Sequence, residues 1–323
     1  MKSWLMRQAG PPNSLELVDL PDPEPCEGWV LIDVKAFGLN RSELYTRQGH
    51  SGDAVTLPRV LGIECVGVVA DAGGTDLKVG QKVAAAMGGL GRTHHGGYST
   101  RTLVPRNNVF PVDTTLDWAT FGALPETYLT ASGAVVDACD VQSGQTVFIR
   151  GGTSSVGMAA ITIAADRGAT VIATTRNPDK SQALRAAGAH HVVIDRGTVA
   201  EEVRELVPVG VDAGVELVGR LETIQDSLLT IRPRGVLSLV GFLGDEWDYG
   251  LPWPPSTVRV TLYSSDTFAS ATTTPVLQAI VDGVSAGTYG ANIDRVVDFT
   301  DVAEAHGIME ANLAKGKLVV MTP

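Results

Sequence analysis

The stretch that decides the fold runs from Thr146 to Arg176 and reads TVFIRGGTSSVGMAAITIAADRGATVIATTR. Its first five residues form a β-branched and aromatic run, which is typical of a buried parallel strand. After a glycine-containing turn at 151–157, residues 158–167 contain no Pro or Gly and are rich in Ala and Ile, which predicts a helix closed by Gly168. A second apolar strand at 170–174 completes a strand–turn–helix–strand unit.

The turn is a candidate phosphate site. Its glycines let the backbone approach a pyrophosphate, whose charge is stabilised by free N–H groups and by the dipole of the following helix. On the pattern G-x-G-x-x-G/A the middle glycine is replaced by Ser154. A tight turn that binds nothing is the alternative, but the flanking strands and helix favour a dinucleotide. The candidate cofactor-binding residues of the turn are Gly151, Gly152, Thr153, Ser154, Ser155, Val156 and Gly157.

The end of the second strand carries no acidic residue. An NAD site usually places Asp or Glu about 20 residues after the glycine turn, where it accepts a hydrogen bond from the ribose 2′-hydroxyl. This sequence has Thr175, Arg176 and Lys180 there instead. A guanidinium fork and an ammonium suit a 2′-phosphate, so we expect these residues to bind NADP(H) in preference to NAD(H). The alternative is that both cations are ordinary solvated surface residues.

Length and composition set the outer bounds. With 323 residues the chain is long enough for two domains. Its net charge of −11 disfavours nucleic acid and anionic membrane surfaces as partners. No segment has the apolar length of a membrane helix or signal peptide. The 3 cysteines, Cys26, Cys65 and Cys139, are far apart and odd in number, which predicts reduced thiols and a cytoplasmic protein.

The pattern of elements changes along the chain. Residues 1 to about 120 contain many short strands separated by Gly and Pro turns, which indicates a barrel or sandwich. Helices are expected at 119–124 and 128–137, broken by Pro125. From 146 onward, strands and helices alternate, which predicts a doubly wound parallel sheet. The expected α/β fold therefore has a β-rich domain formed by 1–120 and 266–323, and a dinucleotide-binding domain at 121–265.

Several short motifs together resemble a known family. They are GLNRSELY at 38–45, GIE at 62–64 with GVV at 67–69, VGQKV at 79–83, GGYS at 96–99, LP at 124–125 with TA at 130–131, the glycine turn, DK at 179–180 with Leu184 and GA at 188–189, and GKLVV at 316–320. Their order and spacing resemble the zinc-free medium-chain dehydrogenases/reductases of the quinone oxidoreductase, or zeta-crystallin-like, type. The resemblance implies a Rossmann domain, a GroES-like barrel domain and a homodimer paired through a strand near 258–262.

Two positions depart from the zinc-binding relatives. Asn40 and Ile63 stand where those enzymes carry Cys and His, and neither residue is a usual zinc ligand. The relatives' cluster of four closely spaced cysteines is also missing. His94 and His95 are adjacent, so in a strand they would point to opposite faces. We therefore predict activity without a metal.

The resemblance also implies the chemistry. It suggests that hydride passes from NADPH to a quinone or an α,β-unsaturated carbonyl, with donors stabilising the oxyanion that develops. By the same resemblance, Asn40 and Tyr45 are catalytic, Tyr45 as a candidate proton donor, and Thr130 lies at the nicotinamide. Gly241, Phe242 and Leu243 follow a strand and are expected to meet the cofactor.

From residue type alone, other roles stay open. Asn40 is also a good helix N-cap, Tyr45 an amphipathic core residue, and Thr130 an ordinary helix threonine. The alternative functions are a zinc-free alcohol or aldehyde dehydrogenase, which needs a base that the motifs do not supply, and a non-catalytic NADPH-binding sensor. The presence of both Asn40 and Tyr45 argues against a site without turnover.

Overall fold

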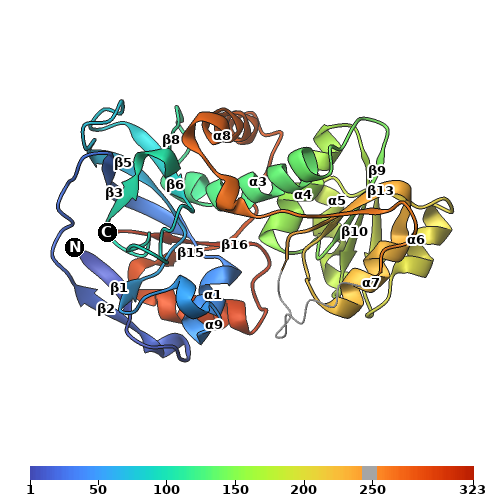
Figure 1. The fold of residues 1–323 in the computed structure, drawn as a ribbon, viewed down its shortest axis with the longest axis horizontal. Helices are drawn as coiled ribbons and strands as arrows, with labels where there is room; N and C mark the ends of the chain where they lie inside the picture. Colours follow the sequence, from blue (N-terminus) through green and yellow to red (C-terminus); the bar gives the residue numbers. More distant parts are fainter. Residues whose placement is uncertain (242–252) are drawn as a thin grey trace. The chain divides into compact units, whose positions relative to one another are not determined.

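The computed structural model describes residues 1–241 and 253–323. The chain divides into two compact units, one formed by Met1–Leu129 with Ser265–Pro323 and the other by Thr130–Ser264. Figure 1 shows the elements of each unit along the chain.

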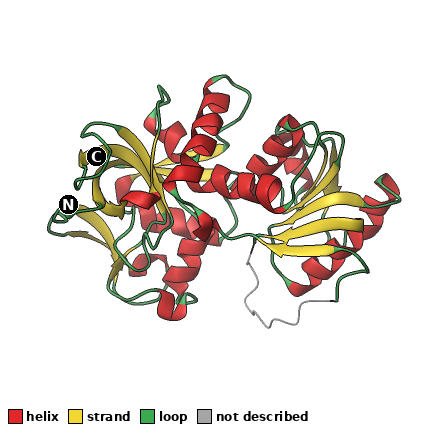
Figure 2. Ribbon diagram, turned by 45° about the horizontal axis from the view of Figure 1, so that its top comes forward, coloured by secondary structure: helices red, strands yellow, loops and turns green. Residues whose placement is uncertain are grey.

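The second unit is built on one parallel sheet. Its strands are β9 (Thr146–Arg150), β10 (Thr170–Thr175), β11 (His191–Ile194), β12 (Val211–Glu216), β13 (Ile231–Leu239) and β14 (Arg259–Leu262). They lie in the order β11-β10-β9-β12-β13-β14. The helices of this unit are α4 (Ser155–Asp166), α5 (Ser181–Ala186), α6 (Ala200–Leu206) and α7 (Leu221–Thr230). They cover both faces of the sheet (Figure 2), which confirms the predicted doubly wound fold.

The strand order fixes where a ligand can enter this sheet. The chain leaves β9 toward β10 on one side and returns to β12 on the other, so the order reverses between β9 and β12. At such a reversal the loops after the carboxyl ends diverge and leave a crevice. The turn after β9 starts at this point. The strands themselves are held by an apolar core that includes Phe148, Ile172 and Leu237, all fully buried.

The first unit is mostly β. Its strands are β1 (Lys2–Met6), β2 (Leu15–Asp19), β3 (Trp29–Gly38), β4 (Arg59–Val60), β5 (Glu64–Asp71), β6 (Lys82–Ala86), β7 (Arg101–Pro105), β8 (Val109–Pro111), β15 (Ile293–Asp298) and β16 (Lys317–Met321). The larger sheet has the order β15-β16-β3-β5-β6-β8, with β7 paired to β3, and β1 pairs with β2 and β4 in a smaller sheet. Strand β16 runs antiparallel to β3, with Val319 opposite Gly38.

The remaining helices include both α-helices and short turns. The α-helices are α1 (Arg41–Gln48), α2 (Trp118–Gly122), α3 (Pro125–Ser132), α8 (Ser270–Ser285) and α9 (Val302–Glu310). The 3₁₀ turns are Pro12–Ser14, Gly52–Ala54, Arg106–Asn108, Pro178–Lys180, Ser265–Thr267 and Phe299–Asp301, and Gly133–Ala138 forms a π-helix.

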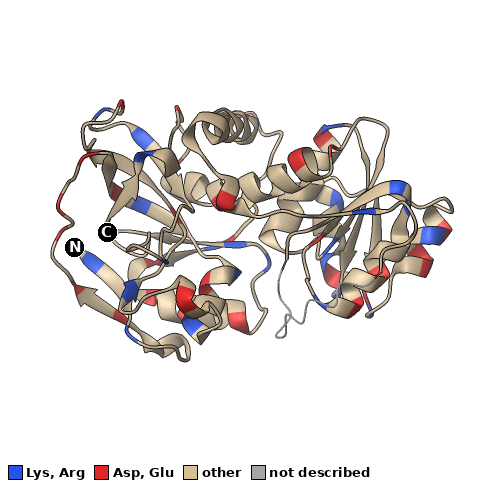
Figure 3. Cartoon of the chain, in the orientation of Figure 1, with Lys and Arg blue, Asp and Glu red and all other residues tan. Residues whose placement is uncertain are grey.

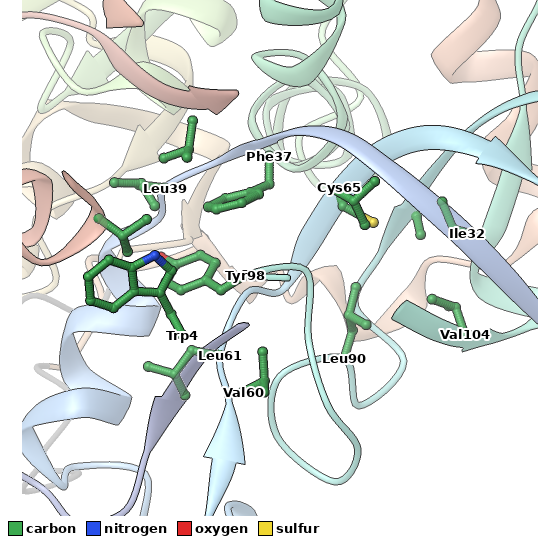
Figure 4. Close-up of a cluster of buried hydrophobic side chains, with 14 of the residues drawn as sticks. Trp4, Ile32, Phe37, Leu39, Val60, Leu61, Cys65, Leu90, Tyr98 and Val104 are labelled. Atoms are coloured by element: carbon green, nitrogen blue, oxygen red, sulfur yellow. The ribbon is translucent and has the colours of Figure 1, made fainter. Parts of the chain in front are cut away.

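The core of the first unit gathers side chains from distant segments (Figure 4). The Phe37 and Tyr98 rings stack with centroids 4.8 Å apart, and both residues are fully buried. Trp4 packs in the same cluster and donates its indole N–H to the carbonyl of Phe299 at 2.7 Å. Burial of each such ring contributes roughly 2–3 kcal/mol, so this cluster ties the N-terminal strand to the segment before α9.

Two predicted helix starts were wrong by three residues. Helix α3 begins at Pro125 itself, not at Tyr128, because a proline at the first helical position loses no hydrogen bond. Helix α4 begins at Ser155, not Met158, because the Ser154 side chain caps it. The cofactor turn is therefore shorter than expected, and its second half already belongs to the helix.

Charged residues are spread over both units, with neither sign confined to one of them (Figure 3). In the part of the chain that the structure describes, no helix is long and apolar enough to cross a membrane.

Candidate active site

The glycine turn presents the start of helix α4. Gly151 has φ +80°, a left-handed conformation that favours glycine. Ser154 is the N-cap, accepting from the Gly157 amide at 3.0 Å and donating to the Gly151 carbonyl at 2.9 Å. The amides of Ser155 and Val156 have no hydrogen-bond acceptor among the described residues, as is normal in a first turn. They are available to an anion at the helix N-terminus.

Gly157 brings the helix against the turn. A Cβ built at this position would lie 2.8 Å from the Gly152 Cα and closer still to the Gly151 carbonyl oxygen. Both neighbours are backbone atoms, so they could not move aside without changing the turn. This is the close helix-to-turn packing that a dinucleotide cradle needs, and the residues present therefore suit such a group.

The first residue of the loop after β13 is also closely packed. The Gly241 amide donates to the Glu216 carbonyl at 3.0 Å, and a Cβ on Gly241 would collide with the Leu217 carbonyl. The Glu216 carboxylate accepts from the amides of Val218 at 3.2 Å and Gly219 at 2.6 Å, and burial raises its pKa to about 7. Through these hydrogen bonds, Glu216 holds the backbone that follows β12 in place. The other two residues predicted here, Phe242 and Leu243, lie outside the described residues.

The predicted 2′-phosphate residues differ in availability. Thr175 is buried, and its hydroxyl donates to the Asn177 carbonyl at 3.0 Å and accepts from the Asn177 amide at 3.1 Å. It therefore shapes the turn after β10. Arg176 is exposed and makes no hydrogen bond or ion pair within residues 1–241 and 253–323. Lys180 ends the 3₁₀ turn Pro178–Lys180 and is half-buried.

In the first unit, Asn40 connects β3 to α1. It occupies the N-cap position of α1, which was the alternative role expected from its residue type. Its backbone N–H donates to the Glu43 carboxylate at 2.7 Å. Its side chain is engaged elsewhere. The side-chain Oδ1 accepts from the Lys317 ammonium at 2.6 Å, and Nδ2 donates to Glu64 Oε1 at 2.9 Å. The second Nδ2 hydrogen has only a long contact, 3.4 Å, to the Gly38 carbonyl.

Glu64 is the centre of this arrangement. Its Oε1 is 2.7 Å from the Lys317 ammonium, and both side chains are buried, 0% and 1% exposed. Its Oε2 accepts from the Glu126 amide in the first turn of α3 at 2.9 Å. A buried carboxylate is stable when paired and hydrogen-bonded on both oxygens, as here. Glu64 is therefore a structural anion that joins α1, α3 and β16.

A second buried chain lies behind Asn40. The Glu43 carboxylate accepts from the Ile63 amide at 2.8 Å and from the Tyr98 hydroxyl at 2.5 Å. The same hydroxyl is 3.0 Å from His306 Nε2. Burial raises the pKa of Glu43 to about 7, raises that of Tyr98 well above its usual value, and lowers that of His306 to about 3. His306 is therefore neutral at physiological pH, and Glu43 changes charge near it.

Glu43 gives a pH-dependent stability with a defined sign. Because its folded pKa lies above its value of 4.5 in the unfolded chain, its contribution to stability is fully present below pH 4.5 and is lost as pH rises to about 7. At 1.36 kcal/mol per pKa unit, the loss is on the order of 3 kcal/mol. Glu43→Gln lacks this titrating group. We therefore expect the free energy of unfolding of the variant, minus that of wild type, to increase by about that much from pH 4.5 to pH 7.5, measured by urea unfolding. If the difference in unfolding free energy between variant and wild type did not change over this range, the Glu43 carboxyl would already be ionised in the folded protein at pH 4.5.

The remaining predicted residues of the described chain are Tyr45 and Thr130. Tyr45, on α1, is half-buried and its ring meets that of His50 edge-on, with centroids 6.0 Å apart. Thr130 is buried on α3, the helix whose first turn Glu64 caps. Within the described ranges no three His, Cys, Asp or Glu side chains gather as a metal site would require.

Sequence reasoning missed most of this buried network. It did not single out Glu43, Lys317, Tyr98 or His306, although all except His306 lie in the quoted motifs. A carboxylate, an ammonium and a phenol within short motifs were a usable signal. Their partners, however, come from other segments of the chain.

Comparisons with known proteins agree with the geometry. Residues 155–282 match a family model described as zinc-binding dehydrogenase, and residues 26–114 match the alcohol dehydrogenase GroES-like domain. Quinone oxidoreductase of Homo sapiens is 27% identical over 99% of this chain and 98% of that protein. The 2-haloacrylate reductase of a Burkholderia species is 27% identical over the same shares. A mycobacterial protein solved in complex with NADPH superposes with a TM-score of 0.85 at 26% identity, covering 99% of both chains.

Proposed function

Because the chain belongs to the medium-chain dehydrogenase/reductase family, of the quinone oxidoreductase type, we propose that it is an NADPH-dependent reductase of quinones or α,β-unsaturated carbonyls that works without a metal ion. The family makes it an oxidoreductase that binds a nicotinamide cofactor. The observation that carries the NADPH preference is Arg176, an exposed guanidinium at the end of β10 where NAD sites have an acid. The proposal includes a homodimer formed at β14, one of the two edge strands of the sheet.

The second unit holds the cofactor in this proposal. The free amides of Ser155 and Val156 would hold the pyrophosphate, because the helix dipole favours negative charge there. Arg176 and Lys180 bind the 2′-phosphate. Gly241 and Thr130 would contact the nicotinamide half. When bound, the nicotinamide supplies the hydride, and the protein supplies orientation and charge stabilisation.

In this proposal the first unit supplies the side chains that bind the acceptor. The oxygen that gains charge needs hydrogen-bond donors, and a phenol and an amide are suitable. Tyr45 donates its hydroxyl proton to that oxygen. Asn40 offers its second Nδ2 hydrogen, which has only the 3.4 Å contact to Gly38. Because Lys317 is committed to Glu64 and Asn40, it is not a free base for removing a proton from an alcohol. In the proposed reduction the proton therefore comes from Tyr45 and not from Lys317.

A panel assay tests the function. NADPH oxidation is followed with quinones, enones and aldehydes, each with and without a chelator. Turnover with quinones or enones that survives chelation is expected. Activity with aldehydes alone, or activity that chelation abolishes and zinc restores, would contradict the proposal. Tight NADPH binding without turnover on any acceptor would favour a sensor.

Arg176→Ala tests the cofactor preference separately. We expect the NADPH dissociation constant to rise about 10- to 100-fold, because a charge-assisted contact to the 2′-phosphate contributes roughly 1.5–3 kcal/mol. NADH, which lacks this phosphate, is expected to bind the variant as it binds wild type. Fluorescence titrations with both cofactors measure the difference. Arg185→Ala, on α5, is the matched control. Equal loss for NADPH and NADH, or no loss, would remove Arg176 from the site.

A further inference from the structure

The amide of Asn40 has a chemically fixed orientation. An ammonium group has only donors, so the Asn40 atom 2.6 Å from Lys317 Nζ must be the carbonyl oxygen. The nitrogen then faces Glu64 Oε1, which only accepts while ionised. A flipped amide would place its NH₂ against the ammonium and its oxygen against the carboxylate. The buried ion pair therefore excludes that orientation at both ends.

The chain makes room for this lysine. Gly38 precedes Asn40 by two residues, and a Cβ there would lie 2.5 Å from Glu64 Oε1 and 2.9 Å from Lys317 Nζ. The Gly38 conformation itself needs no glycine, because its φ is not positive. The missing side chain is thus explained by the space that the ion pair occupies. Pairing of β16 with β3, with Val319 opposite Gly38, brings Lys317 to this place.

We propose that Lys317 is a positioning residue for the reaction: with Glu64, it fixes the Asn40 amide so that an N–H, and not the C=O, faces the acceptor oxygen. This rests on the proposed function, in which Asn40 is an oxyanion donor. Lys317 does not touch the acceptor. It acts through Asn40, and Glu64 links the same amide to the start of α3, the helix that carries Thr130.

Three variants separate positioning from stability. Lys317→Met removes the ammonium but leaves the buried Glu64 charge unpaired, so its melting temperature is expected to fall. The double variant Glu64→Gln/Lys317→Met removes both charges and is expected to regain much of that loss. It still lacks the ammonium that excludes the flipped amide. Lys82→Met is the matched control, since Lys82 donates to the Thr114 carbonyl and lies over the Trp118 ring.

The first readout does not need turnover. In protein labelled with ¹⁵N-asparagine, the Asn40 side-chain signal is assigned by its loss in Asn40→Asp. We expect two resolved, slowly exchanging hydrogens in wild type and in Lys82→Met. In Lys317→Met and in the double variant the signal is expected to shift, and its exchange to quicken at least about tenfold, because the amide samples both orientations. An unchanged signal in both variants would overturn the proposal.

The second readout is kinetic. With a quinone acceptor, kcat is expected to fall about 10- to 100-fold in both variants, as for a misplaced reacting group. NADPH affinity is expected to stay at the wild-type value. A double variant that recovers both stability and kcat would reduce Lys317 to a structural role. If wild type turns over none of the acceptors, the proposed function fails, and the Asn40 signal alone then decides the role of Lys317.

Discussion

Gly157→Ala is expected to weaken NADPH binding about 100-fold, which corresponds to about 2.7 kcal/mol. The added methyl would sit 2.8 Å from the Gly152 Cα and against the Gly151 carbonyl, so the helix start and the turn must separate. The amides of Ser155 and Val156 would then no longer face the same point as the turn. The misfit is also expected to lower the free energy of unfolding by about 1–3 kcal/mol. Calorimetric titration with NADPH and thermal unfolding measure the two effects.

A second helical glycine provides the control. Gly307 lies inside α9, and a Cβ there would meet nothing nearer than the Pro12 Cγ at 3.9 Å. Gly307→Ala is therefore expected to leave NADPH affinity unchanged and to stabilise the protein by about 0.4–1 kcal/mol. NADPH binding by Gly157→Ala at wild-type affinity would show that the cofactor does not use this turn.

Arg150→Met is expected to lower the free energy of unfolding by about 3–5 kcal/mol, the cost of breaking a buried ion pair on one side. Arg150 ends β9 and is fully buried. It forms two bonds to Asp195, at 2.9 and 3.1 Å, and one to Asp226 at 2.8 Å. It also donates to the carbonyls of Thr223 and Gly197. Without it, two carboxylates only 10% and 9% exposed lose their counter-ion.

The comparison for this variant is a solvated pair in the same sheet. Arg232 meets Asp212 at 2.7 Å, but the side chains are 36% and 23% exposed. Arg232→Met is expected to cost under about 1 kcal/mol, because water replaces most of the lost interaction. Urea unfolding of both variants gives the values. Similar losses for the two would mean that burial does not set the strength of these pairs.

The sequence predicted the parts of the fold that depend on local pattern. The run TVFIR forms a strand as predicted, and the Ala-rich segment forms a helix that begins three residues earlier than expected, because period and propensity act within one element. Helix starts were less predictable. Pro125 was taken as a break, but at the first position of α3 a proline stabilises the helix. A proline in the sequence marks a helix boundary, but it does not show whether the helix lies before or after it.

The buried charges were much harder to predict. Lys317 and Asn40 are 277 positions apart, and only the pairing of β16 with β3 brings them together. The periodicity of hydrophobic residues along the sequence gives no information about such a long-range contact. Likewise Tyr98 reaches Glu43 and His306 from a loop, so three ordinary polar residues become one hydrogen-bonded chain only after folding. Sequence patterns identify a residue type, whereas its electrostatic role depends on partners that the pattern does not name.

The pairing of β16 with β3 also orders events during synthesis on the ribosome. Residues 130–264 form one uninterrupted unit and can fold as soon as they emerge. The larger sheet of the other unit must keep an open edge beside β3 until residues 317–321 have been translated. In a nascent chain the parallel sheet is thus complete while the larger sheet of the first unit still has an open edge along β3.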